Sequence, residues 1–224
     1  MDWLQRTQLL AQHLRGWGVA ACAPAATNSL QQQPLRGWQY MQLQAQTRIR
    51  ALSLAGHALE WYTLNDVVMG GRSESAVSVG GRSIGLRFAG VISTVGGGFC
   101  SCRTHDQQLG IPARASGLRI KYTSDGGHYK ITLGCGSKGS RRDLNWQLEL
   151  PAGSGEEEVV APFSEFQASI HGRPMPGEVL NPALVSSIGL NASIFDMRGR
   201  AIPELDGGAF EFQLHQVGVV DALS

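Results

Sequence analysis

Glycine spacing at residues 134–139 is the first pattern that could do chemistry. The segment Gly-Cys-Gly-Ser-Lys-Gly has the spacing that binds a dinucleotide pyrophosphate. That motif needs a helix directly after it, because the free amides of the helix N-terminus meet the phosphates. Residues 140–146 read Ser-Arg-Arg-Asp-Leu-Asn-Trp and lack the apolar repeat of a helix. The pattern favours a β-turn at residues 134–139, and we expect no cofactor.

A second glycine pattern, Gly81-Arg-Ser-Ile-Gly85, matches the nucleophile elbow G-x-S-x-G. The elbow places its serine on a sharp turn between a strand and a following helix. Here Leu86 and Phe88 continue as an alternating, strand-like pattern. The context that would expose Ser83 as a nucleophile is therefore missing, and we expect a protein that is not an enzyme.

Cysteine spacing offers a third kind of chemistry. Cys100 and Cys102 are two positions apart, so both side chains lie on one face of a strand. With Cys135, and with His105 or His128, they could form a zinc or redox site. The C-x-C spacing differs from the pairs of structural zinc sites, and no second pair follows. We favour small buried side chains as the interpretation and expect no metal.

Net charge and the lengths of the apolar stretches argue against two further classes of protein. The chain has 224 residues, with 19 Lys and Arg against 18 Asp and Glu. A formal charge of +1 argues against binding to nucleic acid, which usually needs a basic face. No stretch approaches the roughly 18 apolar residues of a membrane-spanning helix, so we expect no transmembrane segment.

The charge is unevenly distributed along the chain. Residues 1–59 contain five arginines and one acid, whereas residues 60–224 carry a net charge of −3. We therefore predict an N-terminal extension at 1–59 and a folded domain at 60–224. The extension starts with an apolar repeat typical of a short helix, and an Ala- and Gln-rich linker follows. It is either an organelle transit peptide or a helical or disordered leader.

From Glu60 onward the apolar residues alternate with polar ones, which indicates β-strands. Residues 118–122 and 128–133 flank an Asp-Gly turn and predict a hairpin. Further strand-like segments are 84–88, 99–103, 145–150, 159–163, 188–191 and 209–217. Their spacing, together with 29 glycines, favours an all-β domain with a β-sandwich or jelly-roll architecture.

Two stretches stand out within the predicted domain. Residues 61–75 contain Asn65-Asp66 and then Met69-Gly-Gly71, and residues 96–103 contain three glycines before an aromatic strand. Asn and Asp side chains bond neighbouring amides and fix loops, and the glycines indicate close backbone packing. These stretches predict structured loops, which serve either as scaffolding or as an interaction surface.

In order and spacing, these motifs resemble the complex I intermediate-associated protein family, the NADH:ubiquinone oxidoreductase assembly-factor domain. The resemblance covers residues 60–220 and is carried by Trp61, Asn65-Asp66, Met69-Gly-Gly71, Ser73, Phe88-Ala-Gly90, Gly97-Gly-Phe-Cys-Ser-Cys-Arg103, Asp125-Gly126, Tyr129, Trp146, Pro162-Phe163, Phe166, Gly172-Arg173 and residues 188–190 and 208–214. It implies a galactose-binding-like β-sandwich. It also implies a non-enzymatic assembly factor or chaperone, which binds intermediates of a membrane respiratory or photosynthetic complex.

The resemblance further implies protein subunits of such an intermediate as partners, and peripheral membrane association is a further expectation. It implies a mitochondrial location, with a plastid or the bacterial cytoplasm as alternatives. The candidate partner-binding residues are Asn65, Asp66, Met69, Arg72, Ser73, Arg103 and Arg173. Met69 can adapt to apolar surfaces, and the arginines can supply charge-assisted hydrogen bonds. Alternatively, Arg103 pairs with Asp66 and only stabilises the loop.

A carbohydrate-binding module is the alternative function, because sandwiches of this class often hold sugars. Sugar sites usually present aromatic rings on a concave face. Only 7% of the chain is aromatic, and Trp61 and Trp146 lie in patterns that bury them within strands. The sequence therefore favours an assembly factor over a carbohydrate-binding module.

Overall fold

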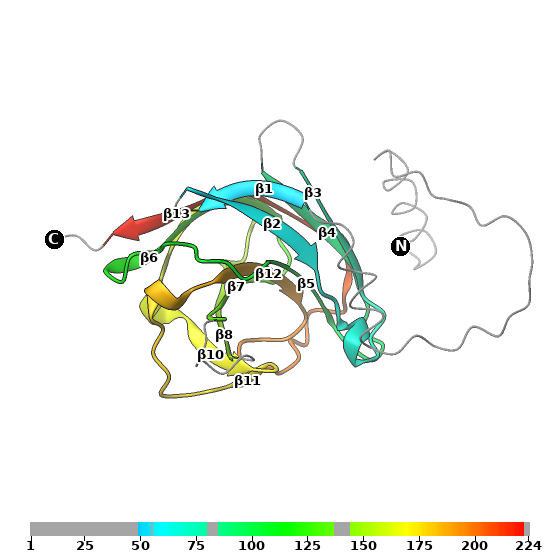
Figure 1. Cartoon of the computed structure of the whole chain (residues 1–224). Coiled ribbons are helices and arrows are strands. Elements are labelled where there is room, and N and C mark those ends of the chain that lie inside the picture. The colour runs from blue at the N-terminus through cyan, green and yellow to red at the C-terminus, as the bar shows by residue number, and fades with distance from the viewer. Residues whose placement is uncertain (1–48, 55, 80–84, 137–143, 222–224) are drawn as a thin grey trace, which may run out of the picture. The chain divides into compact units, whose positions relative to one another are not determined.

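The computed structural model of the chain describes residues 49–54, 56–79, 85–136 and 144–221. Within these residues the chain forms two antiparallel β-sheets and three short 3-10 helices. The fold is therefore the all-β sandwich that the sequence predicted (Figure 1). No helix in the described part of the chain has the length and apolar character that crossing a bilayer requires.

Each sheet combines strands from distant parts of the sequence. The larger sheet has the order β1 (Ile49–Leu54), β2 (His57–Thr63), β5 (Phe99–Thr104), β12 (Ser187–Ser193), β7 (Tyr129–Gly134), β8 (Leu144–Glu149), β10 (Gln167–Ile170) and β11 (Arg173–Pro174). The smaller has the order β3 (Glu74–Val79), β4 (Leu86–Ile92), β13 (Gly208–Asp221), β6 (Ala115–Asp125) and β9 (Ser154–Pro162). The 3-10 helices are η1 (Asp66–Met69), η2 (Phe163–Glu165) and η3 (Pro182–Leu184).

Aromatic side chains join the two sheets at the centre of the core. Phe212 of β13 stacks on Tyr122 of β6, with ring centroids 5.0 Å apart. Its ring also lies 4.7 Å from that of Tyr129, which belongs to β7 in the other sheet. Such aromatic contacts add to the stabilisation from burial alone. Figure 1 shows β4 and β13 arching over β12 and β7, so this contact spans the two layers.

The folded domain starts earlier than the boundary predicted at Glu60. Strand β1 begins at Ile49 and pairs with β2 in antiparallel register. A shift in charge composition does not report strand pairing, which explains why it misplaced the first strand. Residues 1–48 lie outside the described residues, and with them the helix predicted near the N-terminus.

Several predicted strands are confirmed, but the predicted hairpin at residues 118–133 is wrong. Its two strands are β6 and β7, which belong to different sheets. The Asp-Gly turn instead carries the chain from one layer to the other. Asp125 explains how, because its carboxylate accepts bonds from Gly127 N (2.9 Å), from Tyr129 Oη (2.7 Å) and from Glu211 N of β13 (2.8 Å). Burial raises the pKa of Tyr129, which keeps its hydroxyl a donor at this corner.

The two glycine motifs lie partly outside the described residues, but the strands on either side of the first motif are described. Strands β7 and β8, on either side of residues 135–143, are antiparallel neighbours, with Gly134 opposite Asn145. A dinucleotide fold would require a parallel crossover at this point. Residues 137–143 lie outside the described residues, and so does Ser83 of the other motif.

The sheet corner gives a first testable prediction. Replacing Asp125 by alanine removes the acceptor of three hydrogen bonds, so we expect a loss of about 1–3 kcal/mol in the free energy of unfolding. Asp206→Ala, which removes an exposed carboxylate before β13, should leave that free energy nearly unchanged. Chemical denaturation of both variants measures the difference, and equal stabilities would contradict the role given to Asp125.

Candidate functional site

The Asp66 carboxylate joins two turns that are distant in sequence. Asp66 begins η1, which follows β2 after Leu64 and Asn65, and its side chain is fully buried. Oδ1 accepts a hydrogen bond from Ser73 N at 3.0 Å, and Oδ2 accepts one from the Ser73 hydroxyl at 2.6 Å. Oδ2 also accepts from Gly98 N at 2.7 Å and from Phe99 N at 3.3 Å. The buried charge is thus surrounded by donors, which offsets the cost of removing it from water.

The glycines of both turns are explained by the space that Asp66 occupies. A Cβ atom on Gly71 would lie 2.2 Å from Asp66 Cγ, and one on Gly97 would lie 2.1 Å from Asp66 Oδ2. A Cβ atom on Gly96, which has φ of 74°, would lie 2.6 Å from the Gly70 carbonyl oxygen. The two glycine runs therefore permit two backbone segments to close around one carboxylate. We call residues 66–73 and 93–97 together the double turn.

Neighbouring polar side chains hold the double turn to the sandwich. Asn65 is buried, and its Oδ1 accepts a hydrogen bond from Ser75 Oγ at 2.7 Å. Ser93 N donates to the Ser73 hydroxyl at 3.0 Å, which links the two segments a second time. Leu64 N donates to the Ser101 carbonyl at 2.8 Å, and Ser101 Oγ donates back to the Leu64 carbonyl. Partly buried hydrogen bonds thus hold the double turn to the neighbouring strands.

The double turn exposes two large apolar side chains to solvent. Met69 is 67% exposed and Val95 is 56% exposed, although both are large hydrophobic residues. Arg72 of the same turn is also exposed. Val95 was not among the sequence candidates, and its signal was a lone large apolar residue directly before three glycines. This set of exposed side chains is a candidate contact surface.

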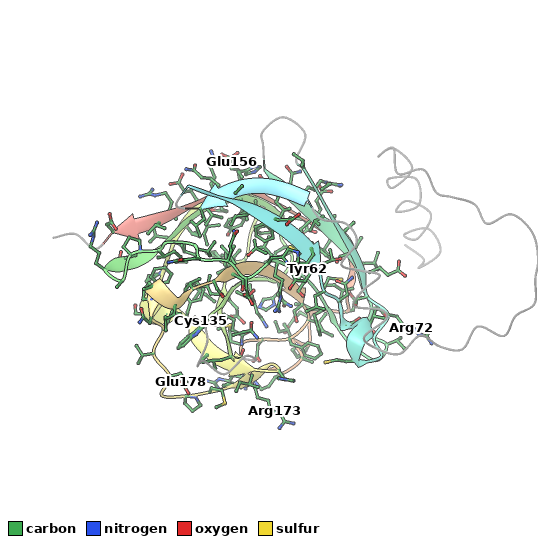
Figure 2. The ribbon with its side chains drawn as sticks, in the orientation of Figure 1. Tyr62, Arg72, Cys135, Glu156, Arg173 and Glu178 are labelled. Carbon is green, nitrogen blue, oxygen red and sulfur yellow. The ribbon has the colours of Figure 1, made fainter. Side chains whose placement is uncertain are left out.

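The structure brings together only part of the predicted set of site residues. Asn65, Asp66 and Ser73 are buried, so they hold the double turn and are not exposed for direct contact with a partner. Met69 and Arg72 lie on its surface. Figure 2 shows Arg72 and Arg173 at separate places on the molecule, and Arg173 lies in the edge strand β11.

The alternative in which Arg103 pairs with Asp66 is wrong. The hydrogen bonds that the Asp66 carboxylate accepts come from Ser73, Gly98 and Phe99. Arg103 instead lies in β5 opposite Tyr62 of β2, on the face of the larger sheet that points away from the core. Burial raises the pKa of Tyr62, while the nearby charge of Arg103 and a hydrogen bond with it oppose that shift.

That outer face carries a continuous line of polar residues and one glycine. Strand pairing aligns them across six strands, and we call them the polar row: Tyr62, Arg103, Gly189, Thr132, Gln147 and Gln167. The alternate residues on these strands, such as Trp61, Ile131 and Trp146, are buried in the core. The ring of Tyr62 stacks on that of His105 with centroids 4.7 Å apart. The sequence did not single out Tyr62, because its partners become visible only with the register.

The cysteines have the buried character that the sequence favoured. Cys100, Cys102 and Cys135 are all buried. Burial raises the pKa of Cys102, and it raises that of Cys135 to about 11, so both thiols stay protonated near neutral pH. Among the described residues, no group of three or more His, Cys, Asp or Glu side chains could hold a metal ion.

The buried carboxylate gives a second prediction. Asp66→Ala leaves the amides of Gly98 and Phe99 and the Ser73 hydroxyl without their acceptor, so we expect a loss of about 1–3 kcal/mol in unfolding free energy. Asp66→Asn should also destabilise, because its amide group would turn two hydrogens toward these donors. Glu204→Ala, at an exposed position, is the control in thermal unfolding. An unchanged melting temperature for both Asp66 variants would rule out the proposed anchor.

Similarity to solved structures supports the architecture described above. The chain resembles a family 11 carbohydrate-binding module of the cellulosomal cellulase Lic26A-Cel5E of Clostridium thermocellum. Their TM-score is 0.54 at 14% identity, covering 80% of this chain and 96% of the module. A family 11 module from the same organism, in complex with a β-1,3-1,4-mixed-linked tetrasaccharide, gives a TM-score of 0.49 at 15% identity, covering 73% and 90%. At these identities the first likeness shows the fold, a galactose-binding-like β-sandwich.

Comparison with curated proteins finds no match. A family model does match, however, and it covers most of the sandwich. The model is that of complex I intermediate-associated protein 30, and it matches residues 50–215, which include the double turn and the polar row. This agrees with the resemblance seen in the sequence motifs. The chain belongs to the complex I intermediate-associated protein 30 family.

Proposed function

We propose that this protein is a non-enzymatic assembly factor, which binds protein subunits of an incomplete membrane respiratory complex through the double turn. Membership of the complex I intermediate-associated protein 30 family supports the assembly role. The observation that carries the surface is the exposure of Met69 and Val95 on turns that a buried carboxylate fixes. Large apolar side chains held rigidly in water mark interaction sites more often than scattered exposure does.

The geometry of the double turn suits recognition of a protein surface that is later buried in the finished complex. Because Asp66 and its donors already fix the backbone, little conformational entropy is lost when a partner binds. The thioether of Met69 is polarizable and flexible, so it can pack against differently shaped apolar surfaces. Arg72 beside it can form charge-assisted hydrogen bonds at the edge of the contact.

We assign the remaining candidates and the location within the same proposal. Asn65, Asp66 and Ser73 act by holding the double turn, and Arg103 and Arg173 belong to separate parts of the surface. The partners are subunits of an assembly intermediate, at the mitochondrion or, as alternatives, in a plastid or the bacterial cytoplasm. Peripheral contact with the membrane that holds this intermediate is part of the same proposal.

Co-purification tests the double turn as a partner surface. We expect Met69→Asp in the tagged full chain to fold normally but to recover at least ten-fold less of the complex I subunits than the wild type does. The reason is that a carboxylate at the centre of an apolar contact loses its water without gaining a partner. Quantitative mass spectrometry of the captured proteins measures the loss.

The matched control is Val179→Asp, because Val179 is 87% exposed and follows Glu178, which Figure 2 places apart from Arg72. This variant should recover subunits at the wild-type level. Equal recovery by Met69→Asp and the wild type would remove the double turn from the proposal. Absence of complex I subunits from the wild-type sample would remove the assembly role itself.

Binding of a glycan is the second candidate function, and the polar row favours it. Tyr62 supplies an aromatic ring, while Arg103, Thr132 and Gln147 supply donors and acceptors of the kind that bind hydroxyl groups. Six strands at their usual spacing make the row about 24 Å long, which suits an extended ligand. The fold likeness to a carbohydrate-binding module is consistent with this candidate.

A glycan array tests the second candidate. We expect any binding by the wild type to fall at least ten-fold in Tyr62→Ala, which removes the ring, and to persist in Tyr62→Phe, which keeps it. Binding that is equal in all three proteins would show that the polar row does not hold the glycan. An array on which the wild type binds nothing would leave the assembly factor as the remaining function.

A further inference from the structure

The loop between β12 and β13 folds as a small body of its own. We call residues 194–202 the Asp196 loop. The Asp196 carboxylate accepts hydrogen bonds from Arg198 N, Arg200 N and Arg200 Nε, each at 2.8 Å. The bond from the Arg200 backbone is the largest cause that lowers the pKa of Asp196, which falls to about 2. The loop therefore keeps its internal shape whether or not it contacts the sheet.

Side chains of β7 and β8 fasten the tip of this loop to the outer face of the larger sheet. Lys130 Nζ donates to the Asp196 carbonyl at 3.0 Å. Gln147 Nε2 donates to the Met197 carbonyl at 3.2 Å, and Met197 N donates to Glu149 Oε1 at 2.9 Å. Met197, itself a residue of the loop, is only 8% exposed. The loop thus covers one end of the outer face, and one of its anchors, Gln147, belongs to the polar row.

Lys130 is the unusual member of these contacts. It is only 5% exposed, although lysine is rarely buried without an ionised partner. On the sheet it lies opposite Glu149 of β8 and Asn191 of β12. The charged and titratable groups that face it are Glu149, Asp196 of the loop and His128, whose Nε2 lies 3.2 Å from Glu149 Oε1. Lifting the loop would return the Lys130 ammonium to water.

We propose that Lys130 is a pH-sensitive latch, which keeps the Asp196 loop closed over the sheet when its amine is neutral and favours release when it is protonated. This device goes beyond the assembly role and does not depend on it. When the loop opens, Gln147 of the polar row loses its bond to Met197 and can bond a ligand. The protonation state of one lysine thereby controls access to the outer face.

The direction of the effect follows from the two environments of the amine. Burial lowers the pKa of Lys130 to about 8 in the closed state, and the nearby Glu149 and Asp196 only partly oppose this shift. With the loop open, the pKa of the Lys130 amine approaches its ordinary value of 10.5. The proton therefore binds more tightly to the open state, so closure strengthens as the pH rises from about 8 toward 10.5 and gains nothing further above it.

Amide hydrogen exchange separates undocking of the loop from its unfolding. The Met197 amide reports docking, because it bonds Glu149, whereas the Arg198 and Arg200 amides bond Asp196 within the loop. After correction for the intrinsic exchange rate, the opening constant at Met197 should fall more than about ten-fold between pH 7.5 and 10. The Arg198 and Arg200 amides should show no such change. Equal changes at all three amides would overturn the latch.

Two lysine variants test whether the pH dependence at Met197 comes from the amine of Lys130. In Lys130→Met, which keeps the length of the side chain without the amine, the opening constant at Met197 should not depend on pH over this range. Lys121→Met, at a lysine of the other sheet, should behave as the wild type. If Lys130→Met fails to fold, a pH titration of the wild type, followed through the NMR chemical shift of Lys130 ¹³Cε, tests the latch instead. A titration near pH 8 that coincides with the Met197 methyl shift supports the latch, and a titration near 10.5 overturns it.

Discussion

The structure depends on one buried carboxylate that is satisfied entirely by neutral donors. Asp66 accepts four hydrogen bonds, which come from the backbone of Ser73, Gly98 and Phe99 and from the Ser73 hydroxyl. A buried charge without donors would cost several kcal/mol, so these groups must stay in place for the fold to persist. Because they come from two segments, the carboxylate holds the connection that follows β2 against the start of β5 at this end of the sandwich. The glycines follow from the same constraint, since any side chain on Gly71 or Gly97 would enter the space of the carboxylate.

The sequence predicted the features whose cause is local. Asn65 and Asp66 next to a glycine run indicated a fixed loop, and the alternation around Cys100 and Cys102 indicated a strand that buries both thiols. These patterns are set by neighbouring residues, so they are visible before folding. The family resemblance rested on their order and is confirmed by the match over residues 50–215.

What the sequence could not predict depends on pairing between distant strands. The Asp125-Gly126 turn has the residues of a hairpin, yet Glu211 N on β13 supplies a donor that holds it as a corner between sheets. Tyr62 and Lys130 looked like ordinary polar positions within strands, because their importance comes from Arg103 and Glu149 on neighbouring strands. The first strand was missed since charge composition, and not pairing, set the predicted boundary. In each case the missing information is register, which one sequence does not contain.

Asp66 and Lys130 are the charged residues that lie buried in the described part of the chain, and they differ in how well hydrogen bonds satisfy them. That difference separates a fixed surface from a movable one. Asp66 has hydrogen-bond donors for both oxygens, so opening the double turn would cost free energy by breaking these bonds. Lys130 has three donor hydrogens, but its hydrogen bond within the described part of the chain is to the Asp196 carbonyl. The cost of burying that ammonium is therefore only partly offset, and water can compete for it. A rigid contact surface and a polar face that a loop covers at one end can coexist in one small domain, because several hydrogen bonds hold the buried charge of the first and, among the described residues, only one holds that of the second.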